Sequence, residues 1–176
     1  DKRIRAGHPW VYANEVAEIR GKGTNGELAA VYDNAGRYIG KGYINHLSKI
    51  LVRIFIRDDS EPDLDFFKAR ISAANDYRIR LGYSDCYRMV FAEADDLPAL
   101  IVDKYHDLMC VQILSLGMEK NKALIVQALV ELFAPRGIYE RSDVAVREKE
   151  GLPLFPHAKR LPTRSPVPIP IFPPVV

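Results

Sequence analysis

Apolar and polar residues alternate most clearly in residues 51–57. Val52, Ile54 and Ile56 share one side of an extended chain, while Arg53 and its odd-numbered neighbours take the other. This period of two is typical of a strand with one face in a core. We therefore expect the opposite face of this strand to form a basic and aromatic surface.

The rest of the first 60 residues shows the same β-rich character. Short apolar runs occupy residues 28–32 and 38–45, and residues 33–36 between them form a run of turn-favouring residues. From Pro62 the period changes to that of a helix, with apolar residues recurring along residues 63–81. We interpret this segment as a helix that links two domains.

The second half of the chain predicts strand, strand, helix and strand. The strands are expected at residues 87–93, 100–105 and 109–114, with His106 and Asp107 in a tight turn. An amphipathic helix follows over residues 119–133, and another strand begins at Ile138. The predicted fold class is therefore α+β: a small β-rich barrel in residues 1–60, a linking helix in 61–82, and a central α+β domain in 83–152.

Residues 153–176 differ in kind from the rest. Eight of the twelve prolines of the chain lie here, and the segment contains no acidic residue. Proline cannot donate to a sheet ladder, so we expect an irregular tail without strands.

The composition is that of a globular protein, and no apolar run approaches the roughly 20 residues that a membrane-spanning helix needs. The N-terminal residues carry charge without a following apolar core, so no secretory signal is predicted. The two cysteines, Cys86 and Cys110, are too few for a disulfide framework or a zinc site. A cytoplasmic protein without a membrane partner is the simplest interpretation.

Charge is distributed unevenly along the chain. The formal net charge is +5 in residues 1–57, −6 in residues 58–150 and +3 in residues 151–176. Such asymmetry indicates that a polyanion meets the N-terminal part, although charge alone does not distinguish RNA from DNA or an anionic surface.

The candidate catalytic and metal motifs have simpler explanations. Residues 21–26 fit the spacing G-x-G-x-x-G, but a strand is expected after them instead of a helix, which favours a plain loop. The cysteines favour structural roles over that of a nucleophile. The four histidines show no metal-ligand spacing, and the acidic residues around Asp95 favour a solvated turn. We predict no catalytic, cofactor-binding or metal-binding residue.

Basic and aromatic residues are interleaved in the first 57 positions. Single-stranded RNA is bound by cations on its phosphates and flat side chains under its bases. The alternative is that the aromatic residues form the core of a small barrel and the cations its solvated surface. The residues alone support the RNA-binding interpretation and the barrel-core interpretation equally.

Four segments resemble one protein family. Residues 5–15 (RAGHPWVYANE) and 40–45 (GKGYIN) resemble the PUA domain of a family of class I methyltransferases. Residues 93–105 (EADDLPALIVDKY) are similar to its acidic-Leu-Pro-Gly-Leu-Ile-Val-Asp signature, with Ala99 in place of the usual glycine and Asp96 at another position where glycine is common. Residues 137–143 (GIYERSD), followed by Arg147 and Glu150, match the end of its central domain.

The family is that of ribosomal RNA large-subunit methyltransferases of the cytosine-C5 type. The resemblance implies a PUA domain that binds ribosomal RNA, a central domain, and a Rossmann-like domain that binds S-adenosylmethionine and carries the catalytic cysteine. We expect the third domain to be absent here, and therefore no S-adenosylmethionine to be bound by this chain and no methyl transfer by it alone.

Three functions follow from these considerations. The preferred one is the RNA-recognising and central part of a 23S rRNA cytosine-C5 methyltransferase. A stand-alone PUA-type RNA-binding module is the alternative, and self-association through an exposed sheet edge, as a homodimer, is a third. The candidate RNA-binding residues are Arg5, His8, Lys41, Lys49 and Arg53. Of these five residues, Lys41 and Arg53 are expected at the surface.

Overall fold

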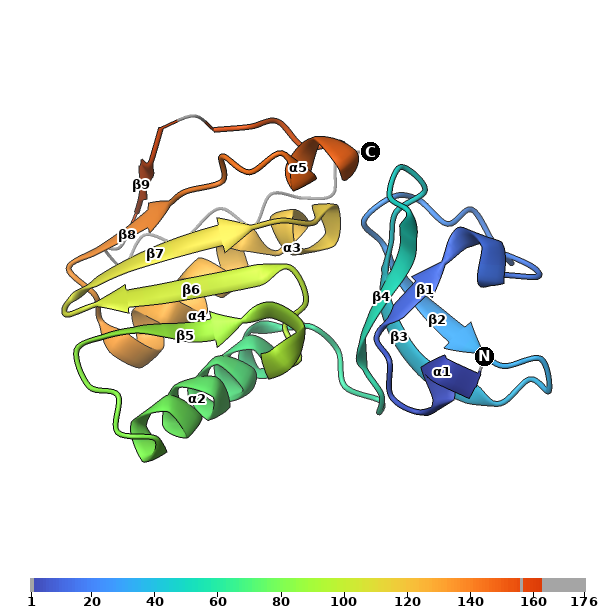
Figure 1. The fold of residues 1–176 in the computed structure, drawn as a ribbon, viewed down its shortest axis with the longest axis horizontal. Coiled ribbons are helices and arrows are strands. Elements are labelled where there is room, and N and C mark those ends of the chain that lie inside the picture. Colours follow the sequence, from blue (N-terminus) through green and yellow to red (C-terminus); the bar gives the residue numbers. More distant parts are fainter. Residues whose placement is uncertain (1, 156, 163–176) are drawn as a thin grey trace.

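The computed structural model describes residues 2–155 and 157–162. Within them the chain forms two sheets that lie side by side, a smaller one from the first part of the sequence and a larger one from the second (Figure 1). The predicted α+β class is confirmed.

The first sheet is antiparallel, with the strand order β1-β4-β3-β2. A one-turn helix precedes it and a short 3-10 helix follows its first strand. Buried aliphatic side chains fill its core, including Val52 and Ile54, as the alternation in residues 51–57 predicts. The elements are α1 (Lys2–Arg5), β1 (Trp10–Tyr12), η1 (Ala13–Glu15), β2 (Leu28–Tyr32), β3 (Tyr38–Ile44) and β4 (Ile50–Ile56).

The long helix α2 (Leu64–Arg80) confirms the helix predicted over residues 63–81. It begins at Asp63, whose carboxylate accepts a hydrogen bond from the amide of Phe66 and so satisfies one free donor of the first turn. Phe67 and Ile71 are fully buried in the core of the second sheet. The helix therefore belongs to the packing of the central domain as well as joining the two sheets.

The second sheet has five strands in the order β5-β6-β7-β8-β9. All neighbouring pairs are antiparallel except β7 and β8, which are parallel and joined through two helices. The predicted helix over 119–133 is divided in two and starts earlier than expected. The elements are β5 (Cys86–Phe91), η2 (Ala92–Asp95), β6 (Leu100–Tyr105), β7 (Leu108–Ile113), α3 (Leu116–Lys120), α4 (Lys122–Phe133), β8 (Gly137–Glu140), α5 (Val146–Lys149) and β9 (Lys159–Leu161).

The strand β9 corrects the prediction that the whole of residues 153–176 is irregular. Residues 159–161 lie between prolines but contain none, so their amides are free to pair with β8, as the register from Ile138↔Leu161 to Glu140↔Lys159 shows. The most proline-rich part, residues 163–176, lies outside the described residues.

The turn between η2 and β6 contains both departures from the signature that residues 93–105 resemble. Asp96 and Ala99, at positions where glycine is usual or common, both have left-handed backbones, with φ of 54° and 63°. A side chain with a Cβ pays a steric penalty of roughly 1–2 kcal/mol in this region. The signature glycine is therefore a backbone requirement of the turn.

We predict that Ala99→Gly raises the free energy of unfolding by about 0.5–1 kcal/mol, because relief of the left-handed strain exceeds the entropy that glycine adds to the unfolded chain. Urea unfolding monitored by circular dichroism measures the change. Ala73→Gly, in the middle of α2, is the matched control and should lower stability by about 1 kcal/mol. A loss of stability at both positions would contradict this account of the turn.

Candidate nucleic-acid interface

The five candidate RNA-binding residues do not form one patch. Arg5 makes an ion pair with Asp33 in the turn between β2 and β3, with a separation of 2.7 Å. Lys49 lies in the turn between β3 and β4, near the opposite end of the sheet. Because a strand rises about 3.3 Å per residue, the length of β3 separates these two turns by roughly 20 Å.

His8 belongs to a compact motif organised by Arg3. The guanidinium of Arg3 donates to both carboxylate oxygens of Glu15, at 2.8 and 2.7 Å, and to the carbonyl of Trp10 at 2.9 Å. It also contacts the ring of His8, whose Nδ1 accepts from the amide of Trp10. Hydrogen bonds from Arg3 and from the amide of Tyr12 lower the pKa of Glu15. This motif fixes the entry of the chain into the sheet.

The prediction that Arg53 lies at the surface is wrong. Its side chain is only 11% exposed and lies between the two sheets, 2.9 Å from the carboxylate of Glu150 and 3.6 Å from that of Glu93. The indole of Trp10 lies beside it and donates to Glu93 at 2.8 Å. The outer face of β4 is therefore the junction of the two sheets and not an open basic surface.

Asn45, which directly follows β3, completes this junction from the side of the first sheet. Its amide donates to the backbone carbonyl of Glu150 at 3.0 Å and to the carboxylate of the same residue at 2.9 Å. Glu150 follows α5 and its side chain is 3% exposed. A carboxylate removed from water is costly unless it is paired and hydrogen-bonded, and here Asn45 and Arg53 supply both contacts.

Apolar packing continues the junction. Tyr43 and Phe55, from adjacent strands of the first sheet, are buried in the same core as α2, α3 and the second sheet. Gly117 in α3 lies against Tyr43 so closely that an added Cβ would be 2.1 Å from its ring. The phenol of Tyr43 accepts a hydrogen bond from Asn121 at 2.7 Å. The two sheets thus share one core along this face.

Lys41 is also less available than expected. It forms an ion pair with Glu61 in the segment before α2, and its side chain is 14% exposed. This partner raises the pKa of Lys41. Of the five candidates, only Lys49 is an exposed cation without an ion pair to a described carboxylate.

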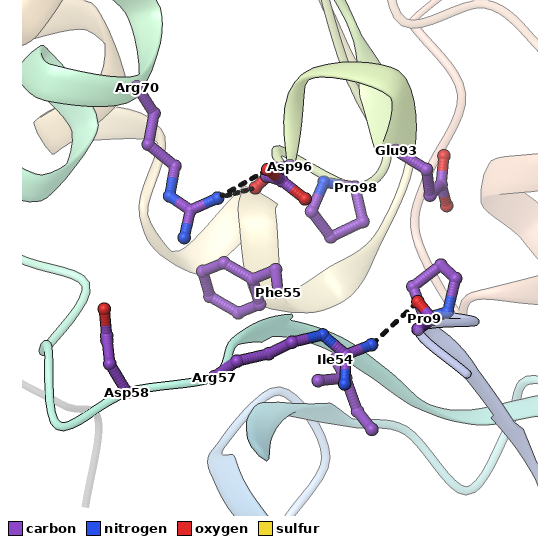
Figure 2. Close-up of a pocket in the computed structure, with 10 residues that line it drawn as sticks. Pro9, Ile54, Phe55, Arg57, Asp58, Arg70, Glu93, Asp96 and Pro98 are labelled. Carbon is purple, nitrogen blue, oxygen red and sulfur yellow. Dashed lines mark hydrogen bonds and ion pairs between the residues drawn. The ribbon is translucent and has the colours of Figure 1, made fainter. Parts of the chain in front are cut away.

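A pocket of about 260 Å³ lies at the edge of the junction (Figure 2). Arg57 and Arg70 lie on opposite sides of Phe55, and Arg70 pairs with Asp96 at 3.3 Å. The carboxylates of Asp58 and Glu93 also line the pocket. Carboxylates therefore outnumber guanidinium groups here, which does not favour binding of a phosphate.

The described residues contain no group of three or more metal-ligating side chains. Burial raises the pKa of Cys110, which disfavours the thiolate, and Asp95 is held by Arg78 at 2.5 Å in place of the solvated turn expected from the sequence. Residues 21–26 form a loop that leads into β2, as predicted. No described helix is long and apolar enough to cross a membrane.

Residues 1–57 match the family described as PUA-like domain. Ribosomal RNA large subunit methyltransferase I from Aliivibrio fischeri is 40% identical over 156 residues, which are 86% of this chain and 39% of that protein. The protein of the same name from Shigella boydii is 37% identical over 158 residues, 88% of this chain and 40% of that protein.

The chain is similar to part of these ribosomal RNA large subunit methyltransferases. It spans about two fifths of the length of these relatives. A solved structure of a putative SAM-dependent methyltransferase from Streptococcus mutans superposes with a TM-score of 0.74 at 15% identity, over 94% of this chain and 41% of that one. This likeness shows that the arrangement of both sheets is a known fold.

We predict that Arg53→Ala lowers the free energy of unfolding by about 3–5 kcal/mol, because it leaves the buried carboxylate of Glu150 without its cation. Chemical denaturation measures the effect. Lys49→Ala, which removes an exposed cation in the turn before β4, is the control and should change stability by less than about 0.5 kcal/mol. Equal, small effects of both substitutions would show that Arg53 is solvated.

A second prediction concerns pH. The backbone amide and guanidinium of Arg37 lower the pKa of Asp33 from 3.8 to about 2. Because the folded-state pKa is depressed, the contribution of this carboxylate is complete above pH 4 and is lost as pH falls toward 2. Asp33→Asn should therefore lower the melting temperature at pH 7 and flatten its pH dependence between pH 4 and 2. A slope as steep as that of the unaltered chain would contradict this role.

Proposed function

We propose that this chain is the RNA-recognising and central part of an S-adenosylmethionine-dependent 23S rRNA methyltransferase that acts at carbon 5 of cytosine. The observation that carries the proposal is the 40% identity to a ribosomal RNA large subunit methyltransferase over 156 residues, which cover the PUA-like sheet and the central sheet together. If the chain were a stand-alone PUA-type RNA-binding module, only the PUA-like domain would need to be similar to these methyltransferases, whereas the central domain is similar as well.

S-adenosylmethionine supplies the methyl group in the proposed reaction, but the described residues do not fit it. The glycine-rich loop at residues 21–26 leads into a strand, whereas a nucleotide-binding loop leads into a helix. Its last glycine, Gly26, also lies against the side chain of Lys120, so the space is filled. We assign cofactor binding and methyl transfer to the additional length that the relatives have, and expect this chain alone to be inactive.

The role proposed for the described domains is to bind ribosomal RNA and hold it in one orientation. The shared core and the Glu150 contacts fix the PUA-like sheet relative to the central sheet. RNA held by the PUA-like domain would therefore be placed at a defined position relative to the central domain.

We also propose that the chain forms a homodimer. Light scattering of the free chain tests this proposal.

We predict that the chain binds a fluorescent single-stranded fragment of 23S rRNA with an affinity that depends on salt. If about three phosphates are neutralised, the logarithm of the binding constant should fall with the logarithm of salt concentration with a slope near −2, at about 0.7 per contact. Fluorescence anisotropy between about 50 and 200 mM salt covers the range in which such contacts weaken.

A slope near zero, or no saturable binding, would contradict RNA recognition by this chain. The cytosine-C5 assignment requires a separate experiment. Ribosomal RNA from cells that lack the gene should be missing one 5-methylcytosine in the large subunit, as detected by bisulfite sequencing. An unchanged pattern would refute the assigned position without affecting the binding result.

A further inference from the structure

The two domains meet a second time at the surface, next to the buried junction. The turn between β3 and β4 lies beside the end of α5 (Figure 1). Leu47 in the turn is so close to Gly151 that an added Cβ at this glycine would be 2.5 Å from the side chain of the leucine. The exposed turn of one domain and the exposed helix of the other therefore form one continuous surface.

A set of polar contacts extends this surface toward α3. Lys120 donates from its ammonium group to the backbone carbonyl of Asn25 at 2.7 Å. The side chain of Asn25 accepts from the amide of His46 at 2.8 Å, and the ring of His46 contacts the carbonyl of Gly23 at 2.9 Å. The loop before β2, the β3–β4 turn and α3 are thereby held together.

Four lysines surround this line of contact. Lys22 precedes Gly23, Lys49 follows the exposed Leu47, Lys120 reaches across from α3, and Lys149 ends α5. All four are exposed, and none makes an ion pair with a carboxylate among the described residues. We call these four lysines the basic seam.

Elsewhere the cations are largely neutralised. Arg3, Arg53 and Lys41 each pair with a glutamate, and Arg5 pairs with Asp33. Two exposed carboxylates, those of Glu27 and Glu148, belong to the same segments of the chain as the lysines of the seam. A local excess of two positive charges therefore remains, on a chain whose total excess is also +2.

We propose that the basic seam binds the sugar-phosphate backbone of a single RNA segment that passes from the PUA-like domain onto the central domain. This inference rests on the proposed function and names the surface that performs it. Lysine ammonium groups contact phosphates as point charges without reading the bases, so the seam holds and orients the RNA and leaves sequence recognition to other residues.

The fixed junction between the two domains lowers the ordering cost of binding RNA to this surface. Because Glu150 is held by Asn45 and Arg53, the backbone segments that carry Lys49 and Lys149 keep one relative position although they belong to different domains. An RNA that meets both contacts does not also have to order two independent domains, which is a cost that flexible partners pay on binding.

The test is the double substitution Lys49→Gln plus Lys149→Gln in the 176-residue chain, with the same 23S rRNA fragment and anisotropy assay. Each lost phosphate contact should reduce the salt slope by about 0.7 and weaken binding in 0.1 M salt about fivefold, so the pair should lose about 25-fold. Lys49→Arg plus Lys149→Arg retains both charges and should bind like the unaltered chain.

Lys104→Gln plus Lys159→Gln is the charge-matched control. These two lysines lie on the second sheet, away from the seam, in β6 and β9, and their loss should leave the slope within experimental error. Melting curves establish that every variant is folded. If the seam variant binds as well as this control, the seam is not the contact surface and the inference fails while RNA binding stands. If the unaltered chain binds no RNA, the proposed function and the inference fail together.

Discussion

The arrangement of this molecule depends on a single buried carboxylate. Glu150 lies between two domains, where an unpaired charge would cost several kcal/mol. The amide of Asn45 and the guanidinium of Arg53 offset that cost only in one relative position of the two sheets. Apolar contacts such as Tyr43 against Gly117 supply most of the buried area, but they are less directional. The polar contacts therefore determine the orientation that the apolar contacts stabilise.

A buried arginine, Arg147, holds the segment that contains Glu150 to the central domain. Arg147 is fully buried, donates to the backbone carbonyl of Pro153 at 2.9 Å, and lies 3.1 Å from Glu119. The segment around α5 is thus held to the central domain by Arg147 and to the PUA-like domain by Glu150. A four-residue helix has little stability of its own. The position of α5 is therefore set by Arg147, within the helix, and by Glu150, directly after it.

The sequence was sufficient for much of the fold because local signals were strong. The helix after Pro62 has a cap at Asp63 and a regular apolar spacing, and it was placed to within a residue at each end. The strand β9 was missed because the surrounding prolines dominate the composition, although residues 159–161 contain none. Composition describes a segment on average, whereas pairing depends on individual amides.

The site was harder to predict for a physical reason. An arginine that alternates with aliphatic residues is usually solvated, and nothing in residues 51–57 indicates that a glutamate 97 positions later covers Arg53. The resemblance to a known family included both Asn45 and Glu150 without relating them. Such pairings between distant residues are visible only in three dimensions.

That distance along the chain has a consequence for biosynthesis. Asn45 and Glu150 are separated by 105 residues, so the PUA-like sheet leaves the ribosome long before its partner carboxylate has been made. During that interval Arg53 and the aromatic face of β4 are exposed to solvent and to other chains. Translation therefore completes the residues of the PUA-like sheet before it makes the residues that cover the outer face of β4.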